Sequence, residues 1–211
     1  MFGSYLNEGI LKRALDNKII DFKAHDLRDW SVDNYKSVDD TPYGGGVGMV
    51  MRIDILYNAL EDIKKKYQTE AKKRKIVLMS AAGKTWNQQL AKEYSKLDEL
   101  IFICGRFEGV DARISNFIDE EISVGDYVLT GGELPAMIIM DSITRLLPGA
   151  LGKDESAIDE SHSEVGVLEY PQYTKPAIFE TDGKQYIVPE VLTSGNHAEI
   201  NKWRKENRKI K

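Results

Sequence analysis

The fold is decided by the stretch KIVLMSAAGKTWNQQLAKEYSKLDELIFICGRFEG, residues 75–109. Two short apolar runs in it, Ile76–Met79 and Leu100–Cys104, are typical of strands that are buried on both faces. Between them, Trp86–Leu97 carries apolar residues at helical spacing. A buried strand, a helix and a second buried strand predict an α/β fold with a parallel sheet covered by helices.

Outward from this stretch the same alternation continues. We predict helices at Ser4–Asn17, Asp54–Tyr67, Val110–Phe117 and Glu133–Leu147, and extended segments at Ile19–His25 and Tyr127–Leu129. The segment Asp26–Met49 is polar and rich in glycine, which indicates a loop.

Composition excludes several classes of protein. The chain has 211 residues, 42% of them hydrophobic, and no apolar run approaches the roughly 20 residues of a membrane span. Its single cysteine and the absence of a signal-peptide pattern predict a cytoplasmic protein without disulfides. Three scattered histidines offer no metal-ligand spacing, so we expect no metal site and no membrane partner.

We predict three regions along the chain. Residues 1–148 form the α/β domain, residues 149–169 an acidic flexible linker, and residues 170–211 a small C-terminal unit. In this unit Ile178–Val188 is typical of a hairpin turning at Asp182-Gly183, and Asn196 is a candidate cap for a helix from Ala198 to about Asn207.

Two stretches are locally basic despite a net charge of −5: residues 64–66 together with residues 72–75, and the tail from residue 201 to residue 211. They fit either solvated helical faces or contacts with nucleic acid.

Ligands of parallel sheets bind beyond the carboxyl ends of the strands. Here the glycine-bearing segments Ser80–Lys84, Gly105–Gly109 and Thr130–Glu133 take that position. The run Gly44–Gly48 fits a mobile surface loop or a loop that lies against a nucleic-acid backbone or base. Likewise, Cys104–Gly109 fits a structural turn after a buried cysteine or a site in which Glu108 accepts hydrogen bonds from a ligand.

Several long motifs in order resemble the bacterial tRNA (guanine-N1)-methyltransferases that modify position 37. The resemblance covers nearly the whole chain and rests on residues 38–49, 104–109, 118–121, 123–135, 173–176 and 194–200. It implies a SPOUT fold, in which the α/β sheet is threaded into a deep trefoil knot, followed by a small, mainly helical C-terminal domain that is truncated here. It also implies an obligate homodimer in which each active site is built from both subunits.

The implied cofactor is S-adenosylmethionine, and the implied substrate is tRNA. The cofactor-binding positions map onto Met79, Ser80, Ala81, Gly105, Phe107, Glu108, Ser123, Val124, Gly125, Asp126, Tyr127, Val128, Leu129, Gly131 and Gly132. Candidate substrate-binding residues are Asp40, Tyr43, Gly44, Gly45 and Gly46 in the glycine-rich loop, with Lys202 and Arg204 in the basic tail.

Guanine N1 carries a proton at neutral pH, so methylation there needs a carboxylate base, and a cation stabilises the charge that develops on O6. The resemblance places the base at Glu160, with Asp159 as the alternative, and the cation at Arg145. Taken alone, the two acids also fit a solvated acidic run, and Arg145 also fits a charge that complements a helix dipole.

Against the family pattern we expect three departures that bear on activity: glutamate in place of aspartate at Glu160, the loss of a first strand and the loss of the last helices. They leave two competing readings open, a non-catalytic RNA-binding relative and a SPOUT methyltransferase acting on another RNA site or base.

Overall fold

The structure is a computed structural model that describes residues 1–67, 73–151, 161–162, 164 and 166–210. Contacts divide the chain into two compact units, Met1–Lys153 and Asp154–Lys211. In the predicted linker, residues 149–169, about half of the residues lie outside the described ones, namely 152–160, 163 and 165.

The first unit is built on a parallel sheet, as the sequence predicts. The strands β3 (Arg74–Thr85), β4 (Glu99–Cys104) and β5 (Glu120–Ser123) pair in the order β4-β3-β5. Both ladders are parallel, so the central strand β3 has a neighbour on each side. The mixed α/β class is therefore confirmed.

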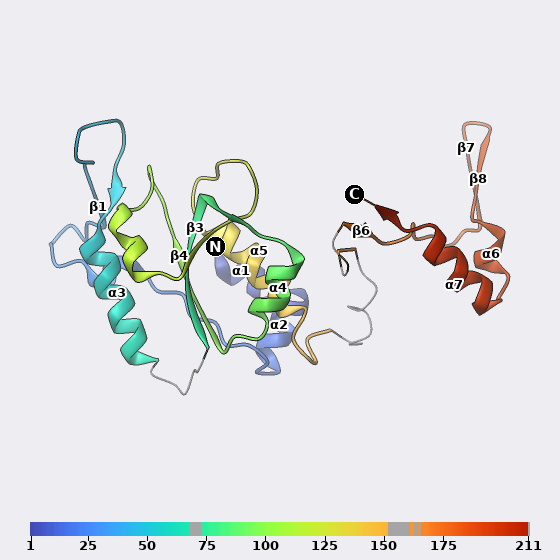
Figure 1. The fold of residues 1–211 in the computed structure, drawn as a ribbon, viewed down its shortest axis with the longest axis horizontal. Helices are drawn as coiled ribbons and strands as arrows, with labels where there is room; N and C mark the ends of the chain where they lie inside the picture. Colours follow the sequence, from blue (N-terminus) through green and yellow to red (C-terminus); the bar gives the residue numbers. More distant parts are fainter. Residues whose placement is uncertain (68–72, 152–160, 163, 165, 211) are drawn as a thin grey trace. The chain divides into compact units, whose positions relative to one another are not determined.

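Strand β3 separates two hydrophobic cores because its side chains point alternately to opposite faces. Ile76 and Leu78 join one core with residues of α3 (Ile53–Lys66), whereas Val77 and Met79 join the other with Tyr94 of α4 (Gln88–Tyr94). The second core also contains Ala136, Ile139 and Ile143 of α5 (Glu133–Thr144). Figure 1 shows α3 on one side of the sheet and α4 and α5 on the other.

Local chemistry fixes the ends of the covering helices. The Asn87 side chain accepts a 3.0 Å hydrogen bond from the Leu90 amide and so caps α4. A side-chain cap of this kind is worth about 1 kcal/mol. At the other helix, Lys64, Lys65 and Lys66 fill the last turn of α3, where positive charge complements the helix dipole.

The remaining elements of this unit are short: α1 (Phe2–Leu6), α2 (Gly9–Asp16), the 3₁₀ helices η1 (Leu27–Trp30) and η2 (Ala112–Phe117), and the strands β1 (Asp39–Asp40) and β2 (Val50–Met51). The single helix predicted over Ser4–Asn17 is interrupted because Gly9 has a φ of +60°. The helix predicted over Val110–Phe117 is instead a 3₁₀ helix that begins at Ala112.

Two predicted extended segments are wrong. Ile19–His25 forms no ladder with another described strand, and Tyr127–Leu129 is part of a bent loop. The sheet strand at this point is β5, which ends at Ser123. Strand β3 is longer than predicted, because it runs through Ser80–Lys84 with a register shift against β5 between Met79 and Lys84.

The second unit contains the predicted hairpin and the predicted helix. Strands β7 (Ile178–Thr181) and β8 (Lys184–Ile187) pair through a turn in which Asp182 and Gly183 both have positive φ. Helix α7 (His197–Glu206) is capped by Asn196, whose side chain accepts hydrogen bonds from the first-turn amides. The unit also contains α6 (Glu190–Thr193) and the pair β6 (Val167–Leu168) with β9 (Lys209–Ile210).

Within the described part of the chain, we find no helix whose length and apolar character would let it span a bilayer.

Candidate active site

Three chain segments meet where β3 and β4 leave their pairing and α5 begins. Met79 is the last residue of β3 to pair with β4, opposite Cys104. The Gly132 amide donates a 2.8 Å hydrogen bond to the Gly105 carbonyl. A Cβ atom at Gly132 would lie 2.7 Å from Cys104 Cα and 3.0 Å from Met79 Cβ, so only glycine allows this approach. The predicted cofactor positions Met79, Gly105 and Gly132 are thus in contact.

The turn 105–109 presents side chains to solvent from a constrained backbone. Phe107 has a φ of +60° and a half-exposed ring, and the Gly109 amide donates to the Arg106 carbonyl. Arg106 Nε lies 2.7 Å from Glu133 Oε1, so an ion pair joins this turn to the first residue of α5. The Glu108 side chain in the same turn is exposed to solvent.

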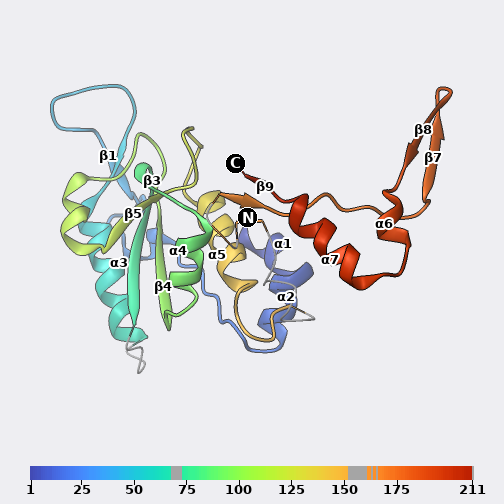
Figure 2. The ribbon, with the colours of Figure 1, turned by 45° about the vertical axis from the view of Figure 1, so that its right-hand side comes forward.

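The glycine-rich loop is tied to this turn at its base. Strands β1 and β2 close the loop, and the Met51 amide donates to Gly109 while the Glu108 amide donates to Met49. A Cβ at Gly48 would overlap the Glu108 side chain at 2.3 Å. Figure 2 shows the loop projecting from β1 at the end of the sheet where the turn and the chain before α5 also lie. Its tip is open to solvent, with Tyr43 fully exposed.

The segment 123–129 folds on itself and leaves apolar side chains uncovered. Buried Ser123 uses its hydroxyl twice, because Oγ donates to the Gly125 carbonyl at 2.9 Å and accepts from the Gly125 amide at 3.2 Å. The Tyr127 hydroxyl donates to the Val124 carbonyl. Tyr127, Val128 and Leu129 remain exposed, which makes a surface suited to an aromatic base. Asp126 is exposed beside them.

Ser80 and Ala81 lie on β3 just past its pairing with β4, where β3 shifts register against β5. The Ser80 hydroxyl accepts from the Ala82 amide at 3.3 Å, and Ala81 is exposed. At Gly83 a Cβ would lie 2.5 Å from the β5 backbone, so glycine lets the strands approach there.

Burial and the nearby Glu133 carboxylate raise the pKa of the Cys104 thiol to about 12. At neutral pH the thiol is therefore protonated and a poor nucleophile. Cys104 packs against the core that Met79 shares with α5, which fits a structural residue at the end of β4.

Comparison with known proteins identifies the family. A family model described as tRNA (Guanine-1)-methyltransferase TrmD matches residues 1–211. This chain belongs to that family. A tRNA (guanine-N(1)-)-methyltransferase of Citrifermentans bemidjiense is 48% identical over 207 residues, which is 98% of this chain and 80% of the relative. Proteins of the same name from Dehalococcoides mccartyi, 46% identical with the same coverage, and Clostridium botulinum, 50% identical over 96% of this chain and 80% of the relative, are also similar.

Within one chain, the predicted catalytic arginine does not lie beside the predicted cofactor-binding segments. Arg145 is the C-terminal cap of α5, whereas Gly132 is its N-terminal cap. The helix has 12 residues, which at 1.5 Å per residue separates the two ends by about 18 Å. Within a single chain, therefore, the structure does not bring Arg145 to the meeting point of Met79, Gly105 and Gly132.

The other predicted residues lie elsewhere. Asp159 and Glu160 are outside the described residues, and Asp40 is an exposed residue of β1 whose carboxylate accepts from the Thr41 amide. On α7, Lys202 lies 3.9 Å from Glu206, and the Arg204 guanidinium lies 5.2 Å from the centre of the Tyr170 ring.

Three residues that organise the site, Arg106, Glu133 and Met51, are not predicted from the sequence. Glu133 was visible as the acid that follows Gly131-Gly132, but its partner Arg106 is 27 positions away, so no local pattern pairs them. Met51 has no sequence signal, yet its sulfur accepts the Arg106 amide at 3.2 Å. Among the described residues, no group of three potential metal ligands is found.

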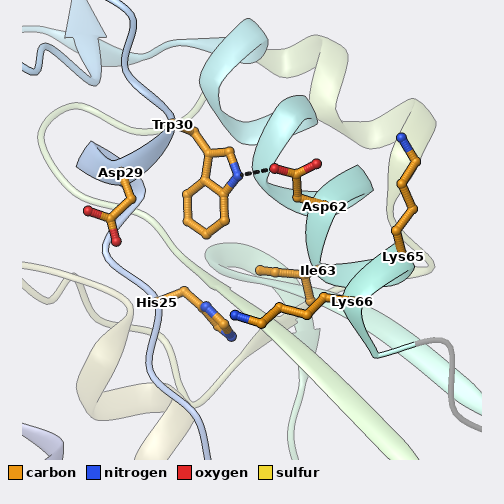
Figure 3. Close-up of a pocket in the computed structure, with 7 residues that line it drawn as sticks. All are labelled: His25, Asp29, Trp30, Asp62, Ile63, Lys65 and Lys66. Atoms are coloured by element: carbon orange, nitrogen blue, oxygen red, sulfur yellow. Dashed lines mark hydrogen bonds between the residues drawn. The ribbon is translucent and has the colours of Figure 1, made fainter.

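A surface pocket of about 600 Å³ lies apart from these loops. His25, Asp29 and Trp30 line one side, and Asp62, Ile63, Lys65 and Lys66 of α3 line the other (Figure 3). Its helix residues belong to the C-terminal turns of α3, close to where β3 begins at Arg74. The pocket is therefore near the amino ends of the strands, whereas the cofactor positions follow their carboxyl ends.

Proposed function

We propose that this chain transfers a methyl group from S-adenosylmethionine to N1 of guanosine 37 in tRNA. The observation that carries the proposal is the contact of Met79, Gly105 and Gly132, which gathers the predicted cofactor segments in a chain of this family. Because tRNA is the substrate, the cytoplasm is the expected place of action.

The side chains and backbone groups of the candidate site fit the proposed cofactor. Glu108 offers an exposed carboxylate for an ammonium group, and the ring of Tyr127 with the apolar Val128 and Leu129 offers a surface for adenine. The backbone of the glycine-bearing turns supplies amides and carbonyls close to the surface. When bound, S-adenosylmethionine supplies an electrophilic methyl group on a sulfonium centre.

The protein's own task is to move a proton and stabilise charge. In our proposal Glu160, with Asp159 as the alternative, takes the proton from guanine N1. Arg145 then stabilises the negative charge that develops toward O6. The glycine-rich loop with Asp40, Tyr43, Gly44, Gly45 and Gly46 closes over the flipped guanosine, since its glycines allow close approach.

A homodimer with shared sites is part of the proposal. The distance along α5 supports it, because Arg145 can serve a cofactor site only if it belongs to the neighbouring subunit's site or if the chain rearranges. Exposed Leu134 and Ile138, four residues apart on α5, give this helix an apolar stripe of the kind that dimer interfaces cover.

The trefoil knot of the SPOUT fold is also proposed. It is supported by backbone contacts between segments distant in sequence: Gly132 packs against Cys104 and Gly105, and the Trp86 amide donates to the Ser123 carbonyl at 2.7 Å.

The C-terminal unit, residues 170–211 in our proposed division, would hold the anticodon arm. Lys202 and Arg204 are exposed on α7, and rings of Tyr170 and Tyr173 pack near Trp203 at centroid distances of 6.3 and 6.2 Å. Cations beside aromatic rings suit phosphates and unstacked bases, with an affinity that falls as salt increases.

A methyl-transfer assay with labelled donor tests the function. Transfer to tRNA with guanosine at position 37, and none to the same tRNA with adenosine there, is the expected result. Equal transfer to both substrates would show that the methylated base is not the one at position 37. No transfer by protein that still binds the donor would identify a non-catalytic relative.

A further inference from the structure

The pocket between residues 25–30 and the end of α3 has the features of a ligand site that the proposed methyl transfer does not use. Trp30 and His25 offer aromatic rings with centroids 6.0 Å apart, and Tyr67 lies 5.8 Å from His25. The Trp30 indole donates a 2.8 Å hydrogen bond to Asp62, which holds the ring in place against α3 (Figure 3).

Cations surround these rings. Lys65 and Lys66 line the pocket, and Lys23 and Lys66 place their ammonium groups 4.7 and 5.8 Å from the centre of the Tyr67 ring. The pKa of His25 is lowered, first by burial and then by Lys66 and Lys23, while Asp29 opposes the shift. Of these causes, only the positive charges of Lys66 and Lys23 would also attract a bound anion.

Hydrogen-bond acceptors also line the pocket. The Asp29 and Asp62 carboxylates are exposed at the pocket, one on each wall. The three kinds of group match the three parts of one ligand: rings stack on a base, carboxylates accept its amino group, and lysines contact a phosphate. An inorganic anion would leave the rings and carboxylates without a role.

We propose that this pocket binds a nucleotide, with its base against Trp30 and His25 and its phosphate at Lys66, whose side chain reaches toward His25 (Figure 3). The nucleotide is either one residue of an RNA chain or a free mononucleotide, and the chemistry of recognition is the same. The site is separate from the proposed methyl-transfer site, so either proposal can fail while the other stands.

Cytidine 5′-monophosphate and a hexamer of cytidine are suitable probes, because they are neither adenine, like the cofactor, nor guanine, like the methylated base. Isothermal titration of the full chain compares wild type with the double variant Lys65→Ala/Lys66→Ala. The matched control is Lys92→Ala/Lys96→Ala, which removes the same charge from exposed positions at α4.

Loss of the two lysine charges, including that of Lys66 at the phosphate, is expected to weaken probe binding about tenfold in the pocket variant, and less than about twofold in the control. Trp30→Leu is expected to weaken binding to a similar degree through lost stacking. Thermal unfolding shows whether Trp30→Leu is folded, and the His25 ring proton followed by NMR in wild type is expected to report a higher pKa with probe bound.

Tighter binding of the hexamer than of the mononucleotide, with the same dependence on the lysines, identifies an RNA chain as the source. Equal affinity for both identifies a free nucleotide. If neither probe binds at millimolar concentration, or if the pocket and control variants bind alike, the proposal is overturned. Binding of inorganic phosphate as tight as that of the mononucleotide would also overturn it.

Discussion

The amide of Gly132 donates a 2.8 Å hydrogen bond to the carbonyl of Gly105, which joins the start of α5 to the turn that follows β4. The two residues are 27 positions apart in the sequence. Because both are glycine, no side chain separates their backbones. This backbone contact therefore helps to set the spacing of two segments that we assign to the methyl donor.

Gly132→Ala tests this contact. The new methyl group would meet Cys104 Cα at 2.7 Å, and overpacking of this kind costs about 1–3 kcal/mol. We expect a lower free energy of unfolding in urea and weaker donor binding by calorimetry. Gly3→Ala is the control, since nothing lies within 4 Å of its Cβ position. Wild-type values for both properties in Gly132→Ala would contradict the assigned role.

The Arg106–Glu133 ion pair is expected to stabilise the contact between the same two segments. Arg106 is 48% exposed and Glu133 only 17%, so solvent screens the pair in part, and we expect a coupling of about 1 kcal/mol or less. A double-mutant cycle with Arg106→Gln and Glu133→Gln measures that coupling in both stability and donor affinity. Additive effects of the two substitutions would show that the pair contributes nothing.

Arg145→Ala and Glu160→Gln are each expected to reduce turnover while leaving donor affinity nearly unchanged, because both groups are assigned to the guanosine and not to the donor. Steady-state kinetics combined with calorimetry separates the two effects. Turnover at the wild-type rate in both variants would refute the assignments.

Mixed dimers test whether Arg145 serves the neighbouring subunit. Arg145→Ala and Glu108→Ala chains, each inactive alone, are expected to recover about a quarter of wild-type activity after random mixing, because half the dimers then hold one intact site of two. Mixtures as inactive as the parent variants would place Arg145 and Glu108 in the same chain's site.

The ion pair of Asp111 with Arg113 predicts a dependence of stability on pH. The Arg113 hydrogen bonds lower the pKa of Asp111 from 3.8 to about 2. A depressed carboxyl pKa contributes stability that is present above pH 3.8 and is lost as the pH falls toward 2. The stability difference between wild type and Asp111→Asn should thus shrink over this window, as urea titrations at several pH values would show. A constant difference from pH 5 to pH 2 would rule out the linkage.

The sequence predicts the central strands of the sheet better than it predicts the short strand β5 and the full length of β3. Ile76–Met79 and Leu100–Cys104 predict the parallel strands because buried strands leave continuous apolar runs. Strand β5 is not predicted because it has four residues, of which only Ile122 and Ser123 are buried and the first two are acids. The extension of β3 through Ser80–Lys84 depends on Gly83 packing against the backbone of β5, which no local pattern reveals.

For the candidate site, motif resemblance marked the segments, and the structure adds how they meet. The contact of Gly105 with Gly132 and the pairing of Arg106 with Glu133 join residues 27 positions apart, so they follow from the tertiary fold and not from spacing. The nucleotide pocket was not predicted as a site, because its two walls are separated by about a helix and a long loop in the sequence. From the sequence alone, the lysines of α3 indicate only a basic stretch.

The alternation of side chains along β3 has a thermodynamic consequence. Val77 and Met79 support one layer of the domain and Ile76 and Leu78 the other, while Met79 also abuts the glycine before α5. Because β3 contributes side chains to both hydrophobic cores, loss of packing in one core also disturbs packing in the other. Heating or denaturant should therefore abolish donor binding and unfold the domain in one cooperative event, with no range of conditions in which a folded domain has lost its ligand.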